Sequence, residues 1–417
     1  MKKINLLWLV FLCCISCKGP NQSNQSKLGG MQLAMDMSGI EAMPVDESNA
    51  QNITVKEDGK WDTDLLVKDI QYIPLETRDD VLIGQVDKLI FEGGRFYIMD
   101  KHQTKSVFVF GEDGRHIHTI SAIGRGPQEY SDIDYIEVDS CNNELVITDM
   151  RGQSMLFFDL DGKFKERKSI GVRFDDIVKI AKDNYVMYSG STYNGHIPEI
   201  EYSNIIIGNP GGEIKYKGLE QTKFYHELIN KIGKGISHIH KFGDKVLFCP
   251  PAANSVYEIT PSKVILRYNF IFPKGTPSLY ESYGAEDFRK KVAENDTWFF
   301  LGNRFSETKE HIITSVEHGI GTRMFFFNKL TGEGFTPGSG IVSGTGRTMR
   351  MLEPKYSDSD YFYDVKTFYD IKDDQEFAEE RGYKNWKLPE ILEGIKESDN
   401  PVIVRYNLNS PFEKARL

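Results

Sequence analysis

An internal repeat with a period near 50 residues constrains the fold of this chain more than any other feature. Residues 93–114 contain a turn, a β-rich strand, a short link, a second strand and a reversing Asp-Gly turn, and residues 142–162 repeat that order. Three anchor positions recur at offsets of 49, 48 and 48 residues: Asp100 and Asp149, Phe110 and Phe158, Gly114 and Gly162. We interpret the two segments as copies of one structural unit.

Four weaker copies follow, at residues 183–207, 242–259, 307–328 and 357–408. Equivalent strand positions in the six units are Phe96, Leu145, Tyr185, Val246, Ile312 and Phe362. A unit of three or four antiparallel strands cannot bury both faces alone, so neighbouring units must stack, and about 50 residues is the size of a propeller blade. We therefore expect an all-β, six-bladed β-propeller with short helical insertions in the later blades. A pair of β-sandwiches or a β-helix is the competing architecture.

Closure of such a ring requires both chain ends to share a blade. Residues 71–76 read as a strand just before the first full unit, so they can supply the missing strand of the last blade. Pro74 within this strand is tolerated if the strand lies at the blade edge, where no ladder hydrogen bond is lost.

The N-terminus has the pattern of an export signal. Met1–Lys3 is basic, residues 4–15 are almost entirely apolar, and a run this short cannot span ~30 Å of hydrocarbon as a permanent anchor. Ser16 before Cys17 resembles the lipobox of bacterial lipoproteins, although Cys14 stands where Leu is usual. We predict a lipoprotein signal peptide over residues 1–16, lipidation of Cys17, a flexible tether over 17–60 and the propeller over 61–417. An ordinary secreted protein is the alternative.

Several segments together resemble a known family, namely residues 72–76, 83–84, 98–100, 109–110 and 124–130. They are similar to the six-bladed β-propeller lipoproteins of Bacteroidetes, relatives of the NHL-repeat propellers. Gln128 departs from the family, whose members tend to carry Gly there. The resemblance implies a lipid-anchored envelope protein with a six-bladed propeller, and implies no established chemistry. Lys18 rather than Asp after Cys17 favours the outer membrane, where the protein would face the periplasm or the cell surface.

The net charge of the chain limits the classes of partner that it can bind. The chain has 51 Lys+Arg against 61 Asp+Glu, a formal charge of -10. Loss of Lys2 and Lys3 with the signal peptide leaves 49 against 61, or -12. This acidic excess argues against nucleic acid as a partner, because phosphate binding requires a surplus of Lys and Arg. Cys141 and Cys249 have no spacing typical of a disulfide, so we expect two unpaired thiols.

Two regions are candidates for ligand binding. In the loop 124–130, Arg125, Glu129 and Tyr130 could contact a ligand if the loop reaches the channel mouth; a structural crossover between blades is the alternative. Helix-forming insertions at 278–298 and 370–396 interrupt the strand pattern, and the second carries Trp386. Loops on a propeller face are where ligands usually bind, but the insertions could instead cover an exposed apolar edge.

Metal and catalytic signatures are weak. The pairs His116/His118 and His238/His240 have a chelating spacing but no identifiable third ligand, so we assign no metal and no cofactor. The Gly-rich segment 338–346 lacks the Lys-Ser or Lys-Thr end of a phosphate-binding loop, and no hydrolase motif occurs.

These observations lead to a functional prediction with two rivals. We expect a monomeric, membrane-tethered propeller, attached through its N-terminal lipid, that binds a glycan, a peptide or a protein and has no catalytic activity. The first rival is a metal-dependent propeller enzyme, a lactonase-like hydrolase or a lyase, with its site in the central channel. Fold analogy alone supports that rival. The second rival is a sensor that passes an envelope signal to a membrane partner.

Overall fold

The computed structural model describes residues 35–58, 61–232, 238–272, 290, 294, 299–318, 321–337, 341–342, 353–380, 382 and 387–412. They belong to one folded unit that spans Leu33–Leu417. No described helix is both long and apolar enough to cross a membrane.

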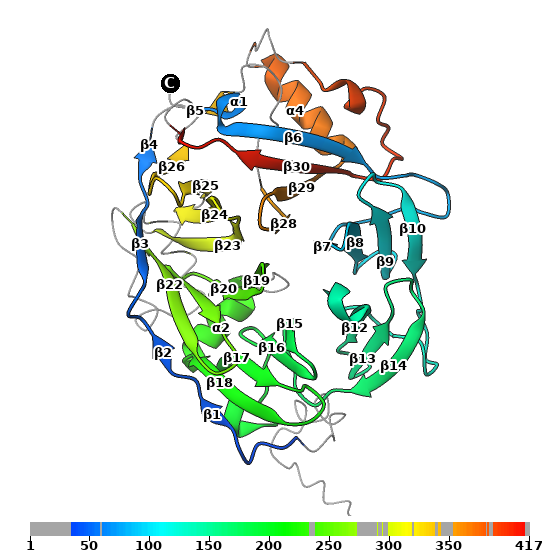
Figure 1. Ribbon diagram of the computed structural model, residues 1–417, viewed down its shortest axis with the longest axis vertical. Coiled ribbons are helices and arrows are strands. Elements are labelled where there is room, and N and C mark those ends of the chain that lie inside the picture. The colour runs from blue at the N-terminus through cyan, green and yellow to red at the C-terminus, as the bar shows by residue number, and fades with distance from the viewer. Residues whose placement is uncertain are drawn as a thin grey trace, which may run out of the picture. The chain divides into compact units, whose positions relative to one another are not determined.

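Six antiparallel sheets form a β-propeller (Figure 1), which confirms the predicted fold class. Blade 1 contains β7 (Lys88–Glu92), β8 (Arg95–Asp100), β9 (Ser106–Gly111) and β10 (His116–Ile120). Blade 2 contains β11 (Tyr135–Asp139), β12 (Glu144–Asp149), β13 (Ser154–Phe158) and β14 (Phe164–Ser169). Blade 3 contains β15 (Asp176–Ala181), β16 (Asn184–Tyr188), β17 (Ser203–Gly208) and β18 (Ile214–Glu220).

The remaining blades follow the same plan. Blade 4 contains β19 (Ile239–Phe242), β20 (Lys245–Phe248), β21 (Ser255–Ile259) and β22 (Val264–Ile271). Blade 5 contains β23 (Phe299–Glu307), β24 (His311–His318), β25 (Gly321–Asn328) and β26 (Gly334–Pro337), and blade 6 contains β28 (Tyr356–Ser357), β29 (Phe362–Lys366), β30 (Val402–Leu408) and β6 (Val67–Pro74). The first strands β7, β11, β15, β19, β23 and β28 contact one another in a closed ring around the channel. All six positions predicted to be equivalent lie in the second strand of their blade.

The ring closes as the sequence predicts. β6 pairs antiparallel with β30, with Pro74 opposite Val402. The strand order β28-β29-β30-β6 places β6 at the outer edge of blade 6. Pro74 therefore costs no ladder hydrogen bond, because no further strand pairs with this edge of β6 among the described residues.

The strands bury both faces, because each blade packs against two neighbours. One apolar cluster joins blade 1 to blade 2 through Tyr97, Val109, Ile136, Leu145 and Leu156. The second and third strands of these blades are therefore almost continuously apolar rather than alternating.

An N-terminal strap, defined here as residues 36–62, runs along the outer edges of blades 3 to 5 (Figure 1). In it, β1 (Glu41–Ala42) pairs parallel with β18, β2 (Val45–Asp46) and β3 (Gln51–Thr54) pair with β22, β4 (Glu57–Asp58) pairs with β26, and β5 (Trp61–Asp62) pairs with β27 (Ile341–Val342). The short helix α1 (Thr63–Leu66) then leads into β6. Met43, Ile53 and Val55 are buried. The fold therefore begins before the predicted boundary at residue 61, because these apolar side chains pack on blade edges. Residues 17–34 of the predicted tether lie outside the described part of the chain.

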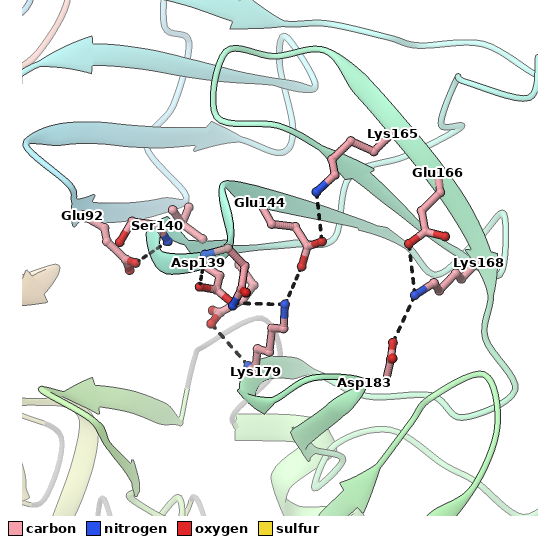
Figure 2. A network of polar contacts seen from close by, with 12 residues as sticks. Glu92, Asp139, Ser140, Glu144, Lys165, Glu166, Lys168, Lys179 and Asp183 are labelled. Carbon is pink, nitrogen blue, oxygen red and sulfur yellow. Dashed lines mark hydrogen bonds and ion pairs between the residues drawn. The ribbon is translucent and has the colours of Figure 1, made fainter.

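Ion pairs join blades 2 and 3 where the first strands end (Figure 2). The ammonium of Lys179 in β15 lies 3.1 Å from Asp139 and 2.5 Å from Glu144, both in blade 2. Lys168 similarly links blade 2 to Asp183 of blade 3 at 3.1 Å. Glu92 of blade 1 accepts a 2.8 Å hydrogen bond from the backbone amide of Ser140. The blades are thus fastened by polar contacts as well as by apolar packing.

The described insertions lie on one face of the ring. We call this the entry face, because the first strand of every blade begins there. Helix α2 (Lys223–Ile232) connects β18 to β19, and α4 (Phe368–Glu380) with the short 3-10 helix η3 (Glu390–Leu392) connects β29 to β30. The β18–β19 connection leads into a first strand, which begins at the entry face, and the β29–β30 connection follows a second strand, which ends there. Both connections therefore lie on the entry face. The other predicted insertion, residues 278–298, lies outside the described residues apart from 290 and 294.

Candidate binding cavity in the central channel

A cavity of about 920 Å³ occupies the central channel, and its lining comes from all six blades. The first strands and the residues just before them supply most of the wall. Thirteen of the lining side chains are acidic, basic or histidine: Asp87, Lys88, Lys101, His102, Asp134, Glu137, Asp176, His240, Lys241, Arg304, Glu317, Glu353 and Lys355. Such a volume is within the range of small-ligand sites.

Aspartates at the start of the first strands organise the entry face. Asp87 accepts a 2.7 Å hydrogen bond from the backbone amide of Lys101, and Asp134 accepts one of 2.7 Å from Met150. Asp175 accepts an equivalent bond from Ser191, also at 2.7 Å. In each of blades 1 to 3 a carboxylate thus holds the loop that follows the second strand, which fixes the shape of the channel mouth.

Ion pairs cross the channel between blades that are not adjacent. Lys88 of blade 1 lies 2.9 Å from Asp176 of blade 3, whose side chain is fully buried. Lys241 of blade 4 pairs with Glu137 of blade 2, whose side chain is 4% exposed. Burial raises the pKa of the Glu137 carboxyl, and the Lys241 ammonium opposes that rise. Removing one partner of such a pair leaves an uncompensated buried charge, so these pairs are structural.

His240 lies beside these pairs in the cavity wall. Burial lowers the pKa of its imidazole to about 4, so the ring is neutral at pH 7. Its ring packs 6.0 Å from that of Phe305, measured between centroids. Among the described residues we find no hydrogen bond to its ring nitrogens. A neutral imidazole offers a ligand one donor and one acceptor.

The wall formed by blades 5 and 6 is irregular. The pairing of β23 with β24 shifts register between Leu301 and Phe305, which is a β-bulge. The bulge is held by side chains: the Arg304 amide donates to the Ser315 hydroxyl at 3.1 Å, and the Thr314 hydroxyl donates to the Arg304 carbonyl at 2.7 Å. The bulge brings the Arg304 side chain into the cavity lining, where it pairs with Glu353.

The loop residues predicted to bind a ligand do not line this cavity. Arg125 is exposed in the crossover between β10 and β11. Glu129 accepts a 2.8 Å hydrogen bond from the Gly126 amide within its own loop. Tyr130 is fully buried, and its hydroxyl donates to the Lys105 carbonyl at 2.7 Å. The same crossover does supply Asp134 to the cavity. Cys17 and Trp386 lie outside the described residues.

The predicted histidine pairs occupy different environments. His116 has a ring nitrogen 2.8 Å from the Thr119 hydroxyl, and His238 is buried with Nδ1 3.0 Å from the Cys249 carbonyl oxygen. Only His240 reaches the cavity. In the part of the chain that the structure describes, no group of three His, Cys, Asp or Glu side chains is arranged to hold a metal ion. Cys141 and Cys249 are free thiols.

Sequence reasoning missed the residues that line the cavity. One signal was available, because Asp87 and Asp134 occupy equivalent places in the two clearest repeats. His240 was noted as half of a pair with chelating spacing, but that spacing did not place it in a cavity. Glu317 and Lys355 had no such signal, since each is an ordinary residue of its strand or link until the ring closes.

Comparison with known proteins agrees with the architecture. Residues 49–407 match the model of a family described as a domain of unknown function, DUF4934. A solved Bacteroides fragilis protein that is thought to be exported has 16% identity and a TM-score of 0.67, over 86% of this chain and 100% of that one. A Bacteroides vulgatus member of the DUF4221 family has 8% identity and a TM-score of 0.46, over 83% and 97%. No curated protein matches the chain. At these identities the structural likeness shows the fold alone.

Proposed function

The chain belongs to the DUF4934 family, and from this membership, the propeller fold and the cavity we propose that it is an exported, non-catalytic binding module of the cell envelope. The observation that carries the proposal is the 920 Å³ cavity lined by charged side chains from every blade. The described helical insertions α2 and α4 lie on the entry face, and several residues that line the cavity lie at the starts of the first strands on the same face. Ligand sites on a rigid scaffold are typically formed by such loops and cavities.

The N-terminal pattern supports the proposed location. The basic start, the short apolar run and Cys17 are what a lipoprotein export signal requires. The B. fragilis protein of similar fold is thought to be exported. On this proposal, Cys17 carries the lipid that holds the propeller at the outer membrane, and the strap follows the predicted tether in the chain and first pairs with blade 3. A Cys17→Ala variant should lose incorporation of radiolabelled palmitate and leave the membrane fraction; retention of both would refute the anchor.

Binding in the cavity is tested with the full chain, purified in detergent. We would measure ligand-induced thermal stabilisation with two probe sets, neutral oligosaccharides and short peptides, because a ligand that binds only the folded state raises its stability by RT ln(1 + [L]/Kd). His240→Trp places a larger ring in the cavity wall and should weaken stabilisation by any probe that contacts this wall.

Two comparison variants make this test specific. Arg125→Ala and Trp386→Ala remove side chains predicted to bind a ligand from loops. Arg125 does not line the cavity, and Trp386 lies outside the described residues. If those variants lose binding and His240→Trp keeps it, the ligand site is on the loops and the cavity is excluded. If no probe stabilises the parent chain, the binding proposal itself fails for both ligand classes.

A further inference from the structure

The charges on the two sides of the cavity are organised differently. On the side of blades 1 to 4, basic groups are paired with acidic ones: Lys88 with Asp176, Lys241 with Glu137, and Lys101 with Asp134 at 3.2 Å. Within each pair the charges cancel, and the partners are at least two thirds buried. A ligand would have to break a structural ion pair to use these six groups. Asp87, a further carboxylate on this side, accepts hydrogen bonds from the Lys101 amide and the Gln85 side-chain amide.

Blades 5 and 6 also contain an ion pair, Arg304 with Glu353, and in addition they present two opposite charges that have no ion pair of their own among the described residues. The carboxylate of Glu317, in β24, accepts a hydrogen bond of 2.8 Å from the Thr322 hydroxyl. Among the described residues it has no ion pair of its own, although the Arg304 guanidinium, which pairs with Glu353, lies near enough to lower its pKa. Lys355, just before β28, is exposed and has no ion pair in the part of the chain that the structure describes. Both residues line the same cavity, on adjacent blades.

The backbone near Glu317 is adapted to this arrangement. Gly302 lies in the bulge of β23, and a Cβ atom added there would lie 2.6 Å from Oε1 of Glu317 and 2.2 Å from Oγ of Ser315. Both distances are too short for real contacts, so any side chain at position 302 would displace the carboxylate. Burial also raises the pKa of Glu317. The Thr322 hydrogen bond and the nearby Arg304 guanidinium oppose this rise. A half-buried carboxylate that has no ion pair of its own is costly to maintain, and such groups concentrate at functional sites.

We propose that the cavity recognises a zwitterionic peptide segment, whose ammonium group binds Glu317 and whose carboxylate binds Lys355. The neutral imidazole of His240 faces the same cavity and supplies one donor and one acceptor for a peptide group. A neutral glycan would leave both charges unpaired, whereas a peptide with free termini satisfies both. This inference rests on the proposed function, because it assumes that the cavity is the binding site.

The test is isothermal titration of the full chain with four forms of tetraglycine: free, N-acetylated, C-amidated and doubly blocked. Free tetraglycine should bind at least tenfold more tightly than the doubly blocked form, because hydrogen bonds to charged groups are the stronger ones. Glu317→Gln should remove the preference for a free amine and Lys355→Met the preference for a free carboxylate. Lys309→Met and Glu310→Gln are matched controls on an exposed turn of blade 5 and should change neither preference.

The outcomes separate this inference from the proposed function. Equal binding of the free and doubly blocked peptides, or charge preferences that survive both cavity variants, would overturn the zwitterion proposal. If the peptides do not bind but a neutral oligosaccharide binds and His240→Trp weakens that binding, the cavity remains a binding site and the inference alone is wrong. If neither class binds, both proposals fail. Gly302→Ala is an additional arm, since it keeps both charges and should weaken binding of the free amine by displacing Glu317.

Discussion

Truncation of Ile53 tests whether the N-terminal strap is part of the propeller's stability. β3 of the strap pairs parallel with β22, and Ile53 lies opposite Phe270. The pairing continues beyond β3 with a 2.9 Å hydrogen bond from the Val55 amide to the Ile271 carbonyl. Ile53 is 1% exposed and belongs to the apolar cluster between blades 4 and 5 that includes Tyr268 and Phe270. If the strap only rests on the ring, this side chain contributes little to stability.

The magnitude follows from burial. An Ile→Ala substitution removes three carbons at about 0.8 kcal/mol each and leaves a cavity, so we expect the free energy of unfolding to fall by roughly 3 kcal/mol. An unfolding entropy of ~2.1 cal/mol/K per residue over ~380 folded residues converts this loss to a decrease in Tm of about 4 °C. The strap can also detach locally before global unfolding, and the measured loss would then be smaller at equilibrium but visible in hydrogen exchange.

The assay is denaturant unfolding of the full chain, with hydrogen exchange read at the Val55 amide. Gln51→Ala is the matched control, because Gln51 is exposed in the same strand. Ile53→Ala should lower the denaturation midpoint or accelerate exchange at Val55, while Gln51→Ala does neither. If the two variants behave alike in both measurements, the strap does not contribute to stability in the way that its burial indicates.

Two further predictions concern ring closure and pH. Asn400 is 4% exposed; its Nδ2 donates to the carbonyls of Glu76 at 2.8 Å and Val81 at 2.7 Å, and its side-chain oxygen accepts from the Ile83 amide at 2.8 Å. Asn400→Ala leaves these buried backbone groups unpaired, so it should lower the free energy of unfolding, measured by denaturation, by about 2–3 kcal/mol. An effect below about 0.5 kcal/mol would contradict this role. Burial lowers the pKa of His238 and His311 to about 4. As the pH falls from about 6.5 to 4, these imidazoles take up protons in the unfolded chain but not in the folded chain, which favours unfolding. The denaturation midpoint should therefore fall across that pH window. Burial raises the pKa of Asp364 to about 6, which has the opposite sign, so Asp364→Asn should steepen the fall, and a flat or unchanged profile would refute the assignment.

The blades were predictable because their signal is local. The second and third strands of a blade are buried on both faces, so apolar runs and reversing turns recur wherever a blade recurs. The same reasoning located the closing strand, since residues 71–76 had a strand pattern and no blade of their own. The divergent spacing of the later units did not obscure the pattern, because insertions such as α2 and α4 lie between strands.

The strap was not predictable from its own residues. Its strands are two to four residues long, and its buried side chains Met43, Ile53 and Val55 are separated by polar residues without periodicity. What orders it is the row of unpaired backbone groups on β18, β22 and β26, strands that lie well over 100 residues further along the chain. Edge strands attract another strand in this way whatever its side chains are.

The predicted loop site and the cavity differ in the same way: the first is set by local sequence and the second by residues distant in the chain. Glu129 and Tyr130 drew attention because they cluster with glycines and a proline, yet that local pattern is what a self-contained loop needs: Glu129 bonds to the Gly126 amide and Tyr130 to nearby carbonyls. Glu317 and Lys355 lie in unremarkable strand and link sequence, about forty residues apart, and they share a wall only because blades 5 and 6 are neighbours in a closed ring. In a propeller, a conspicuous local cluster of polar and turn residues therefore tends to satisfy itself. The side chains left available for a ligand are those whose surroundings come from several blades. A repeat pattern can place such side chains in the ring, but it cannot show that they are functional.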